Sequence, residues 1–159
     1  MLPTGLIIKN NMQVENNQLE RLKEYFKSRD DVAFAFLYGS QAKGNATRLS
    51  DFDIAVYFYP RQRHPIEFEE EYYYDGENNI WKDLEVILKK EVELLVLNRA
   101  SSIIASSAIK GIPLVMNDWG LYLDFMLIIT DLADDFAEFL ISDYKERNKI
   151  GKRDEDKAD

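Results

Sequence analysis

The sequence predicts a single α/β (α+β) domain, in which a small mixed sheet is flanked by helices and a long helix closes the chain. Short apolar runs alternate with amphipathic segments of helical period, an order that favours a sheet covered by helices. The chain has 159 residues, 46% of them hydrophobic and 31% charged, which is ordinary for one globular domain with a real core. An apolar stripe of helical period runs through about the last quarter of the chain.

The first half predicts a helix and two strands. Residues 15–28 have apolar side chains at helical spacing, namely Leu19, Leu22, Tyr25 and Phe26. Residues 32–38 (VAFAFLY) form a short apolar, aromatic run typical of a buried strand. Residues 41–50 are polar and contain glycine, which indicates a turn with at most one helical turn. Residues 51–59 (DFDIAVYFY) predict a second strand, which Pro60 ends.

The second half predicts a further alternation after a stretch, residues 61–76, that has no clear period and is interpreted as an irregular insertion. A helix is expected over 78–90, a strand over 92–97, and a helix over 101–110 with Gly111 as its C-cap. Residues 113–116 predict an edge strand. Residues 118–148 predict one helix of roughly 45 Å, which is longer than the body of a small domain.

The domain division follows from these elements. Residues 1–14 are an N-terminal extension, 15–148 the folded domain with its long helix, and 149–159 a charged tail expected to be disordered. The apolar face of the last helix is wider than one contact needs. Core packing is the first interpretation of this face, and a partner or homodimer seam is the second.

Composition excludes several classes of protein. The net charge of −9 argues against direct nucleic-acid binding, because such binding depends on Lys and Arg at phosphates. The chain has no cysteine and a single histidine, His64, so any metal must rest on oxygen ligands, which favours Mg²⁺ or Mn²⁺. No apolar run reaches the roughly 18 residues of a membrane span, and the first residues lack a signal-peptide pattern. We therefore expect a cytoplasmic protein.

The segment LYGSQAKGNATRLSDFDIAVY, residues 37–57, carries the chemistry. Gly39 lets the backbone turn sharply and lets an anion approach the main chain, and the Ser40 hydroxyl can donate to phosphate oxygens. Lys43 adds a positive charge beside this turn, and Gly44 again frees the backbone.

Two carboxylates follow at the start of the second strand. Asp51 and Asp53 are two residues apart, so both side chains project to the same face, about 7 Å apart along the chain. Like charges at this spacing are costly unless a cation lies between them. A third carboxylate is expected from the next strand, where Glu93 is preferred because it lies between Val92 and Leu94; Glu91 is the alternative.

These residues resemble a known family. Gly39-Ser40, ten further residues and then Asp51-x-Asp53 in an apolar strand resemble the nucleotidyltransferase signature of the DNA polymerase β superfamily. The longer string GSQAKGNATRLSDFDIAVY, with VELLVLNRA downstream and a long final helix, is similar to the minimal nucleotidyltransferase (MNT) antitoxins, which are partners of HEPN-domain ribonuclease toxins. The resemblance covers about residues 15–145.

The resemblance implies a nucleotidyltransferase sheet, ATP and Mg²⁺ (or Mn²⁺), and transfer of AMP to a tyrosine of the HEPN toxin, which silences its ribonuclease. It places the nucleotide on Gly39, Ser40, Lys43, Gly44 and Ser50. The catalytic and metal-binding carboxylates would be Asp51, Asp53 and Glu93. Glu93 stands where the family usually has aspartate, and Lys43 where arginine is common.

Two other functions stay open at this point. The chain could bind nucleotide weakly and neutralise the toxin only by forming a complex, or it could transfer a nucleotide to a small molecule. Each motif also has an ordinary interpretation when taken alone, since glycine-serine turns are common and an Asp-x-Asp at a strand start is often a solvated edge.

Overall fold

Four strands form one mixed sheet in the order β3-β2-β1-β4. The structure is a computed structural model that describes residues 16–47, 51–61 and 72–158. The strands are β1 (Val32–Tyr38), β2 (Phe52–Phe58), β3 (Val92–Val96) and β4 (Ile112–Met116). β1 runs antiparallel to both β2 and β4, whereas β2 and β3 are parallel. The end of β1 therefore lies beside the starts of β2 and β4, and these three strand ends frame the candidate site.

The helices lie between and after these strands. They are α2 (Asn16–Lys27), α3 (Gly39–Lys43), α4 (Glu77–Leu88), α5 (Ser102–Ala108) and α6 (Trp119–Ala158), and a 3₁₀ turn, η2, covers Leu97–Arg99. The predicted order of helices and strands is thus confirmed, including the fourth strand at one edge of the sheet. Among the described residues, none of the helices combines the length and the apolarity that a membrane span requires.

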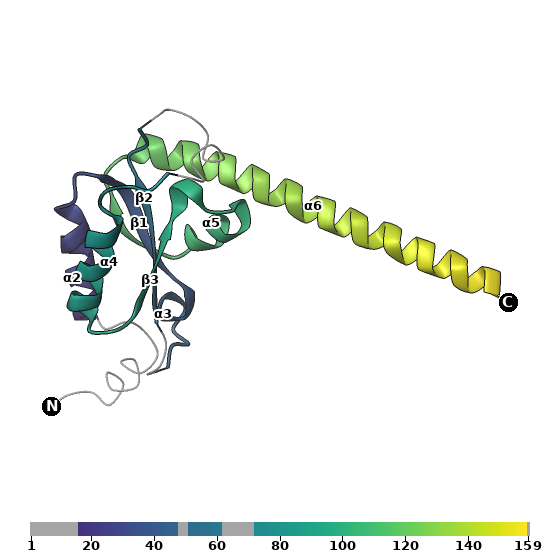
Figure 1. Cartoon of the computed structure of the whole chain (residues 1–159), viewed down its shortest axis with the longest axis horizontal. Helices are drawn as coiled ribbons and strands as arrows, with labels where there is room; N and C mark the ends of the chain where they lie inside the picture. The colour runs from purple at the N-terminus through teal and green to yellow at the C-terminus, as the bar shows by residue number, and fades with distance from the viewer. Residues whose placement is uncertain (1–15, 48–50, 62–71, 159) are drawn as a thin grey trace.

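One face of the sheet is covered by α2 and α4 (Figure 1). Alternation along each strand decides which side chains reach this face, because successive residues of a strand point to opposite sides. The helices contribute Leu22 and Phe26 from α2 and Ile80, Leu84 and Leu88 from α4, all buried. The strands contribute Leu37, Phe52, Ile54, Val56 and Phe58, among others.

The opposite face is covered by α5 and the first turns of α6. Its buried cluster joins Phe34, Phe36, Ala55 and Tyr57 of the sheet to Ala105, Ala108, Phe125 and Ile129 of the two helices. The rings of Phe34 and Tyr57 stack with centroids 4.7 Å apart, and Phe125 meets both rings edge-on. Tyr38 and Leu95 are partly buried against this cluster. Because side chains alternate along a strand, residues an even number of positions away on the same strand also lie on this face.

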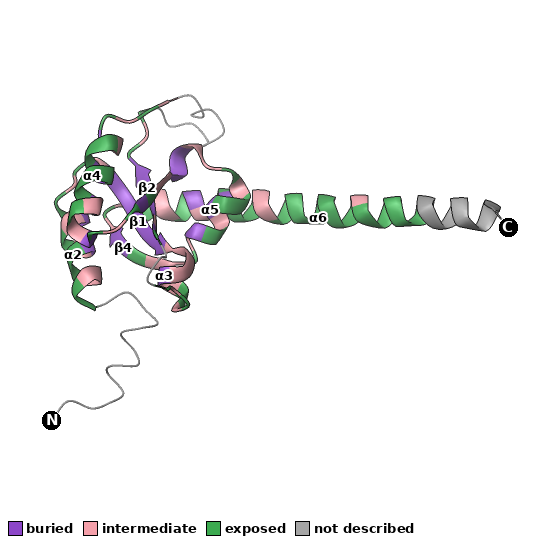
Figure 2. Ribbon diagram, turned by 60° about the horizontal axis from the view of Figure 1, so that its bottom comes forward, coloured by how far each residue is buried: buried purple, intermediate pink, exposed green. Residues whose placement is uncertain are grey.

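The last helix leaves the body of the domain after its first turns (Figures 1 and 2). Up to residue 149, where burial is described, its last buried side chain is Ile129, and most of the side chains after it are exposed. The helix has 40 residues and is therefore about 60 Å long. It continues to Ala158, so the boundary expected at residue 148 falls inside the helix. Proline is absent from this stretch, and pairs such as Asp143–Arg147 at helical spacing favour its continuation.

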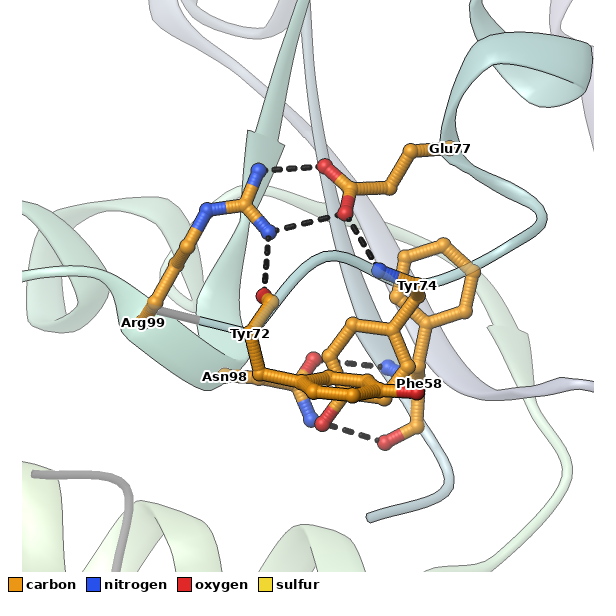
Figure 3. A network of polar contacts seen from close by, with 6 residues as sticks. All are labelled: Phe58, Tyr72, Tyr74, Glu77, Asn98 and Arg99. Atoms are coloured by element: carbon orange, nitrogen blue, oxygen red, sulfur yellow. Dashed lines mark hydrogen bonds and ion pairs between the residues drawn. The ribbon is translucent and has the colours of Figure 1, made fainter. Parts of the chain in front are cut away.

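A buried asparagine closes the far end of β2, the end opposite the candidate site. The Asn98 side chain accepts a hydrogen bond from the Phe58 N–H and donates one to the Phe58 carbonyl, both at 2.9 Å. It thereby acts as one more rung of the sheet, after the backbone of the neighbouring strand has turned away. Figure 3 shows this pairing beside a second polar network.

The second network fixes the residues that follow the irregular stretch. Arg99 binds the Glu77 carboxylate with two guanidinium nitrogens and donates to the Tyr72 carbonyl, and Glu77 also accepts from the Tyr74 N–H (Figure 3). The Arg99 guanidinium also lies 4.7 Å from the centre of the Tyr73 ring. Residues 61 and 72–76 of the stretch interpreted as an irregular insertion contain no strand or helix, and 62–71 lie outside the described residues.

Candidate active site

Tyr38, Asp53 and Glu93 lie side by side across three strands. Tyr38 at the end of β1 faces Asp53 near the start of β2, and Asp53 faces Glu93 on β3. Directly opposed residues of neighbouring strands point to the same face of a sheet. The Asp53 and Glu93 carboxyl groups lie close enough for hydrogen bonding and charge repulsion between them to raise the pKa of Asp53. The row therefore places two carboxyl groups in contact at the end of the sheet.

This contact makes the corner strongly anionic. Burial, the hydrogen bond with Glu93 and the charges of Glu93 and Asp51 together raise the pKa of Asp53 to about 6. Burial, followed by the charges of Asp53 and Glu93, raises the pKa of Tyr38 to about 12. Each shift means that another negative charge at this place is disfavoured. A cation bound between the carboxylates would relieve the repulsion.

The backbone at Gly39 is pressed against the Asp53 carboxyl group. Gly39 has φ +72°, a conformation that side chains rarely adopt. A Cβ atom placed on it would lie 2.2 Å from Asp53 Oδ2, which no real contact permits. Glycine is thus required here for two reasons, the left-handed backbone and the close approach of the carboxylate.

The rest of the motif forms the short helix α3. Gly44 ends this helix in the left-handed conformation, at φ +79°, and its N–H donates to the Ser40 carbonyl at 3.1 Å. Its glycine is therefore explained by a helix end, which is a structural role. Lys43 is exposed on the last turn, close to the pocket described below. Ser50, also expected to bind nucleotide, lies outside the described residues.

A pocket of about 470 Å³ opens beside the Gly39 turn, on the β1–β4 side of the carboxyl pair. One wall consists of residues from the end of β1 and from α3, namely Tyr38, Gly39, Ala42 and Lys43. The other wall comes from α5, the turn after it and the first residue of β4, namely Ser107, Lys110, Gly111 and Ile112. This volume lies in the range of small-molecule sites.

The second wall contains residues that the sequence analysis missed. Ser107 and Lys110 are about 70 residues from the Gly-Ser motif along the chain. Gly111 was expected as the C-cap of α5, and this expectation is wrong, because α5 ends at Ala108 and its C-cap is Ile109. Gly111 instead packs against β1, where a Cβ would lie 2.2 Å from the Leu37 carbonyl oxygen. The position of these residues could have been inferred from an edge strand antiparallel to the first strand. Such a strand brings the turn before it close to Gly39, at the end of the first strand.

The described residues include oxygen donors suited to a hard cation, but they do not include a preformed centre of three carboxylates. Asp53 and Glu93 form the pair, and Asp51 lies exposed just before β2, with its charge felt at Asp53. Within residues 16–47, 51–61 and 72–158, no set of three acidic or histidine side chains is gathered as a metal ion would need. Mg²⁺ commonly takes one or two carboxylates and completes its shell with water and phosphate oxygens. The Asp53–Glu93 pair, in which burial and the neighbouring Glu93 carboxyl group raise the pKa of Asp53, fits that requirement.

Comparisons with known proteins agree with this arrangement. The family described as "Polymerase beta, Nucleotidyltransferase" matches residues 20–119, which include the motif, the carboxyl pair and the pocket. A solved toxin–antitoxin complex with AMP-PNP aligns at a TM-score of 0.54 and 18% identity, over 84% of this chain and 98% of that chain. A mutant of the toxin–antitoxin pair MntA-HpeT aligns at 0.52 and 19% identity, over 87% and 98%. A structure from Shewanella oneidensis aligns at 0.50 and 16% identity, over 86% and 98%.

At identities this low, the similarity establishes a shared fold. Among curated proteins, no sequence matches the chain significantly.

Proposed function

The chain belongs to the polymerase β nucleotidyltransferase family, and we propose that it is an MNT-type antitoxin that transfers AMP from ATP to a tyrosine of a HEPN-domain toxin. Nucleotidyl transfer follows from the family, which the matched span of 20–119 establishes. The acceptor is the proposed part. It is supported by the resemblance of the motif strings to MNT antitoxins and by structural neighbours that are toxin–antitoxin complexes, one of them with AMP-PNP.

The observation that carries the proposal is the Asp53–Glu93 pair against Gly39. Two carboxyl groups in contact, at the end of a sheet and beside a glycine turn, form a site that favours a divalent ion carrying a polyphosphate. A purely structural role does not account for this geometry, because the contact raises the pKa of Asp53 and so opposes its ionisation in the folded state.

In the proposed site, Asp51, Asp53 and Glu93 hold the ion, and ATP lies across the Gly39 turn. Mg²⁺ or Mn²⁺, when bound, neutralises charge on the phosphates and orients them. Gly39 lets the Asp53 carboxylate lie against the main chain, and Ser40 and Lys43 supply a hydroxyl donor and a positive charge to the phosphates. Gly44 positions Lys43 by ending α3, and Ser50 is proposed from the motif alone.

The transfer step needs a base at the acceptor. The hydroxyl oxygen of the toxin's tyrosine attacks the α-phosphorus, the bond from that phosphorus to the bridging oxygen breaks, and pyrophosphate leaves. The phenolic proton passes to a carboxylate, for which we propose Glu93, because it is exposed on the edge strand β3. The longer side chain of Glu93, compared with the usual aspartate, is expected to make the rate sensitive to its position.

The test combines purified chain, its cognate HEPN toxin, ATP and Mg²⁺, and follows the mass of the toxin. The proposal expects a gain in AMP units that disappears in Asp53→Asn, while the matched variant Asp30→Asn, at an exposed aspartate away from the site, transfers normally. An unchanged toxin mass with the wild-type chain, or equal transfer by Asp53→Asn, would show that the chain is not this adenylyltransferase.

Neutralisation by complex formation alone is a second candidate, which the exposed apolar face of α6 favours. Phe139 and Leu140 are 64% and 49% exposed on the part of the helix beyond the body, and Phe136 and Ile141 are exposed nearby. Exposed apolar surface of this kind marks sites of protein association. The variant Asp51→Ala distinguishes the two candidate functions. Neutralisation by binding alone predicts that this variant still silences the toxin, whereas AMP transfer predicts an intact complex in which the toxin stays active.

A further inference from the structure

The pocket beside Gly39 has a local charge opposite to that of the whole chain. The protein carries a net charge of −9, yet the titratable side chains lining this pocket are two lysines, Lys43 and Lys110, and the weakly acidic Tyr38. The hydroxyl of Ser107 adds a further donor on the same wall as Lys110. A pocket that collects ammonium groups in an acidic protein favours an anion.

The position of the pocket relative to the carboxyl pair limits what this anion can be. The carboxyl groups lie on β2 and β3, the pocket lies toward β4, and the end of β1 with Tyr38 and Gly39 separates them. A ligand that reaches both must pass over Gly39. A nucleoside triphosphate whose α-phosphate lies at the carboxyl pair would extend its outer phosphates across this glycine into the pocket.

The wall that carries Lys110 is held firmly against β1. Gly111 packs so closely on the Leu37 carbonyl that a Cβ would lie 2.2 Å from its oxygen. The N–H groups of Lys110 and Gly111 donate to the carbonyls of Ser107 and Ala108 at 3.3 and 3.0 Å, which closes a tight turn at the end of α5. The backbone of Lys110 is thus fixed beside the last residues of β1.

We propose that Lys110, outside the Gly-Ser motif, contacts the outer phosphates of a nucleotide bound at the Gly39 turn, and that it makes the site prefer a triphosphate to a monophosphate. This inference rests on the proposed function and extends it from the motif to the turn between α5 and β4. Lys43 and Lys110 both line the pocket, the first from α3 and the second from the turn after α5. Because AMP lacks the outer phosphates, Lys110 contributes nothing to its binding.

The test compares the affinities of three ligands for the full chain in the presence of Mg²⁺, by titration calorimetry: a non-hydrolysable ATP analogue, AMP and inorganic tripolyphosphate. Lys110→Ala is expected to weaken the analogue and tripolyphosphate about tenfold, and to leave AMP unchanged. Lys110→Arg should keep most of the affinity, since it keeps the charge. Lys82→Ala, at an exposed lysine of α4 away from the pocket, serves as the matched control and should bind all three as the wild type does.

The outcomes separate this inference from the proposed function. Unchanged affinity of Lys110→Ala for the analogue would overturn the inference, as would an equal loss for AMP, which would place the nucleoside in the pocket. Suppose that the wild type binds the analogue, that Lys110→Ala binds it about tenfold more weakly, and that the wild type transfers no AMP to a toxin. The inference about Lys110 then stands and the proposed function fails. If the wild type binds neither the analogue nor tripolyphosphate, both fail.

Discussion

Replacing Gly39 by alanine tests the geometry of the site most sharply. The added Cβ would lie 2.2 Å from Asp53 Oδ2, whereas an ordinary contact begins near 3.4 Å, so the carboxyl group must move by about 1.2 Å (3.4 minus 2.2). The positive φ of Gly39 adds a backbone cost of about 1–2 kcal/mol for alanine. We therefore expect a stability loss of that order, together with a displaced Asp53.

The loss of function should be larger than the loss of stability. Misplacing a catalytic group by about 1 Å can lower the rate roughly 100-fold. Urea unfolding measures the first effect, and AMP transfer at a temperature where both proteins are folded measures the second. Gly120→Ala is the matched control, because a Cβ there makes an ordinary 3.4 Å contact in the first turn of α6. A Gly39→Ala protein that folds and transfers AMP like the wild type would refute the role given to this glycine.

Three further predictions concern ionisation and the two polar networks. Burial and neighbouring carboxylates hold the pKa of Asp53 at about 6, against about 4 in the unfolded chain, so its contribution to stability is greatest below pH 4 and is lost as the pH rises through about 6. In metal-free buffer, the urea midpoint of the wild type minus that of Asp53→Asn should therefore fall across this range. A difference that does not change with pH would contradict the shift. Asn98→Ala should lower the free energy of unfolding in urea by about 2 kcal/mol or more, because it leaves the buried N–H and carbonyl of Phe58 without a hydrogen-bond partner. A loss below about 0.5 kcal/mol would mean that water replaces the side chain. Arg99→Ala should destabilise the fold by about 1–3 kcal/mol, since it leaves the carboxylate of Glu77, 13% exposed, without its guanidinium; an unchanged melting temperature would contradict this.

Sequence patterns predict most of the fold, because the apolar period follows the local structure closely. The run 32–38 is bounded by charge on one side and glycine on the other, and β1 has those bounds. The strand expected over 51–59 and the helix expected over 78–90 differ from the structure by one or two residues at each end. The long helix differs most at its C-terminal end, since a charged composition suggests disorder although it is also compatible with an extended helix.

The candidate site is predictable only where it is local in sequence. The Gly39 turn and Asp53 belong to one motif, so their proximity follows from a strand, a turn and a strand. Glu93 needed the further assumption that β3 pairs with β2, which the structure has, with Glu93 opposite Asp53. Lys110 has no sequence pattern that marks it, because its place depends on β4 pairing with β1 and on the packing of Gly111.

The central claim is that Asp53 and Glu93 together hold a divalent ion that carries the phosphates of a nucleotide. Crystals of the protein grown with Mn²⁺ and a non-hydrolysable ATP analogue test it directly, since manganese is located by its anomalous scattering. We predict a manganese peak in contact with both carboxylates, with the phosphates of the analogue crossing the Gly39 turn. Full occupancy of manganese and nucleotide elsewhere on the protein, with no manganese between the two carboxyl groups, would contradict the account.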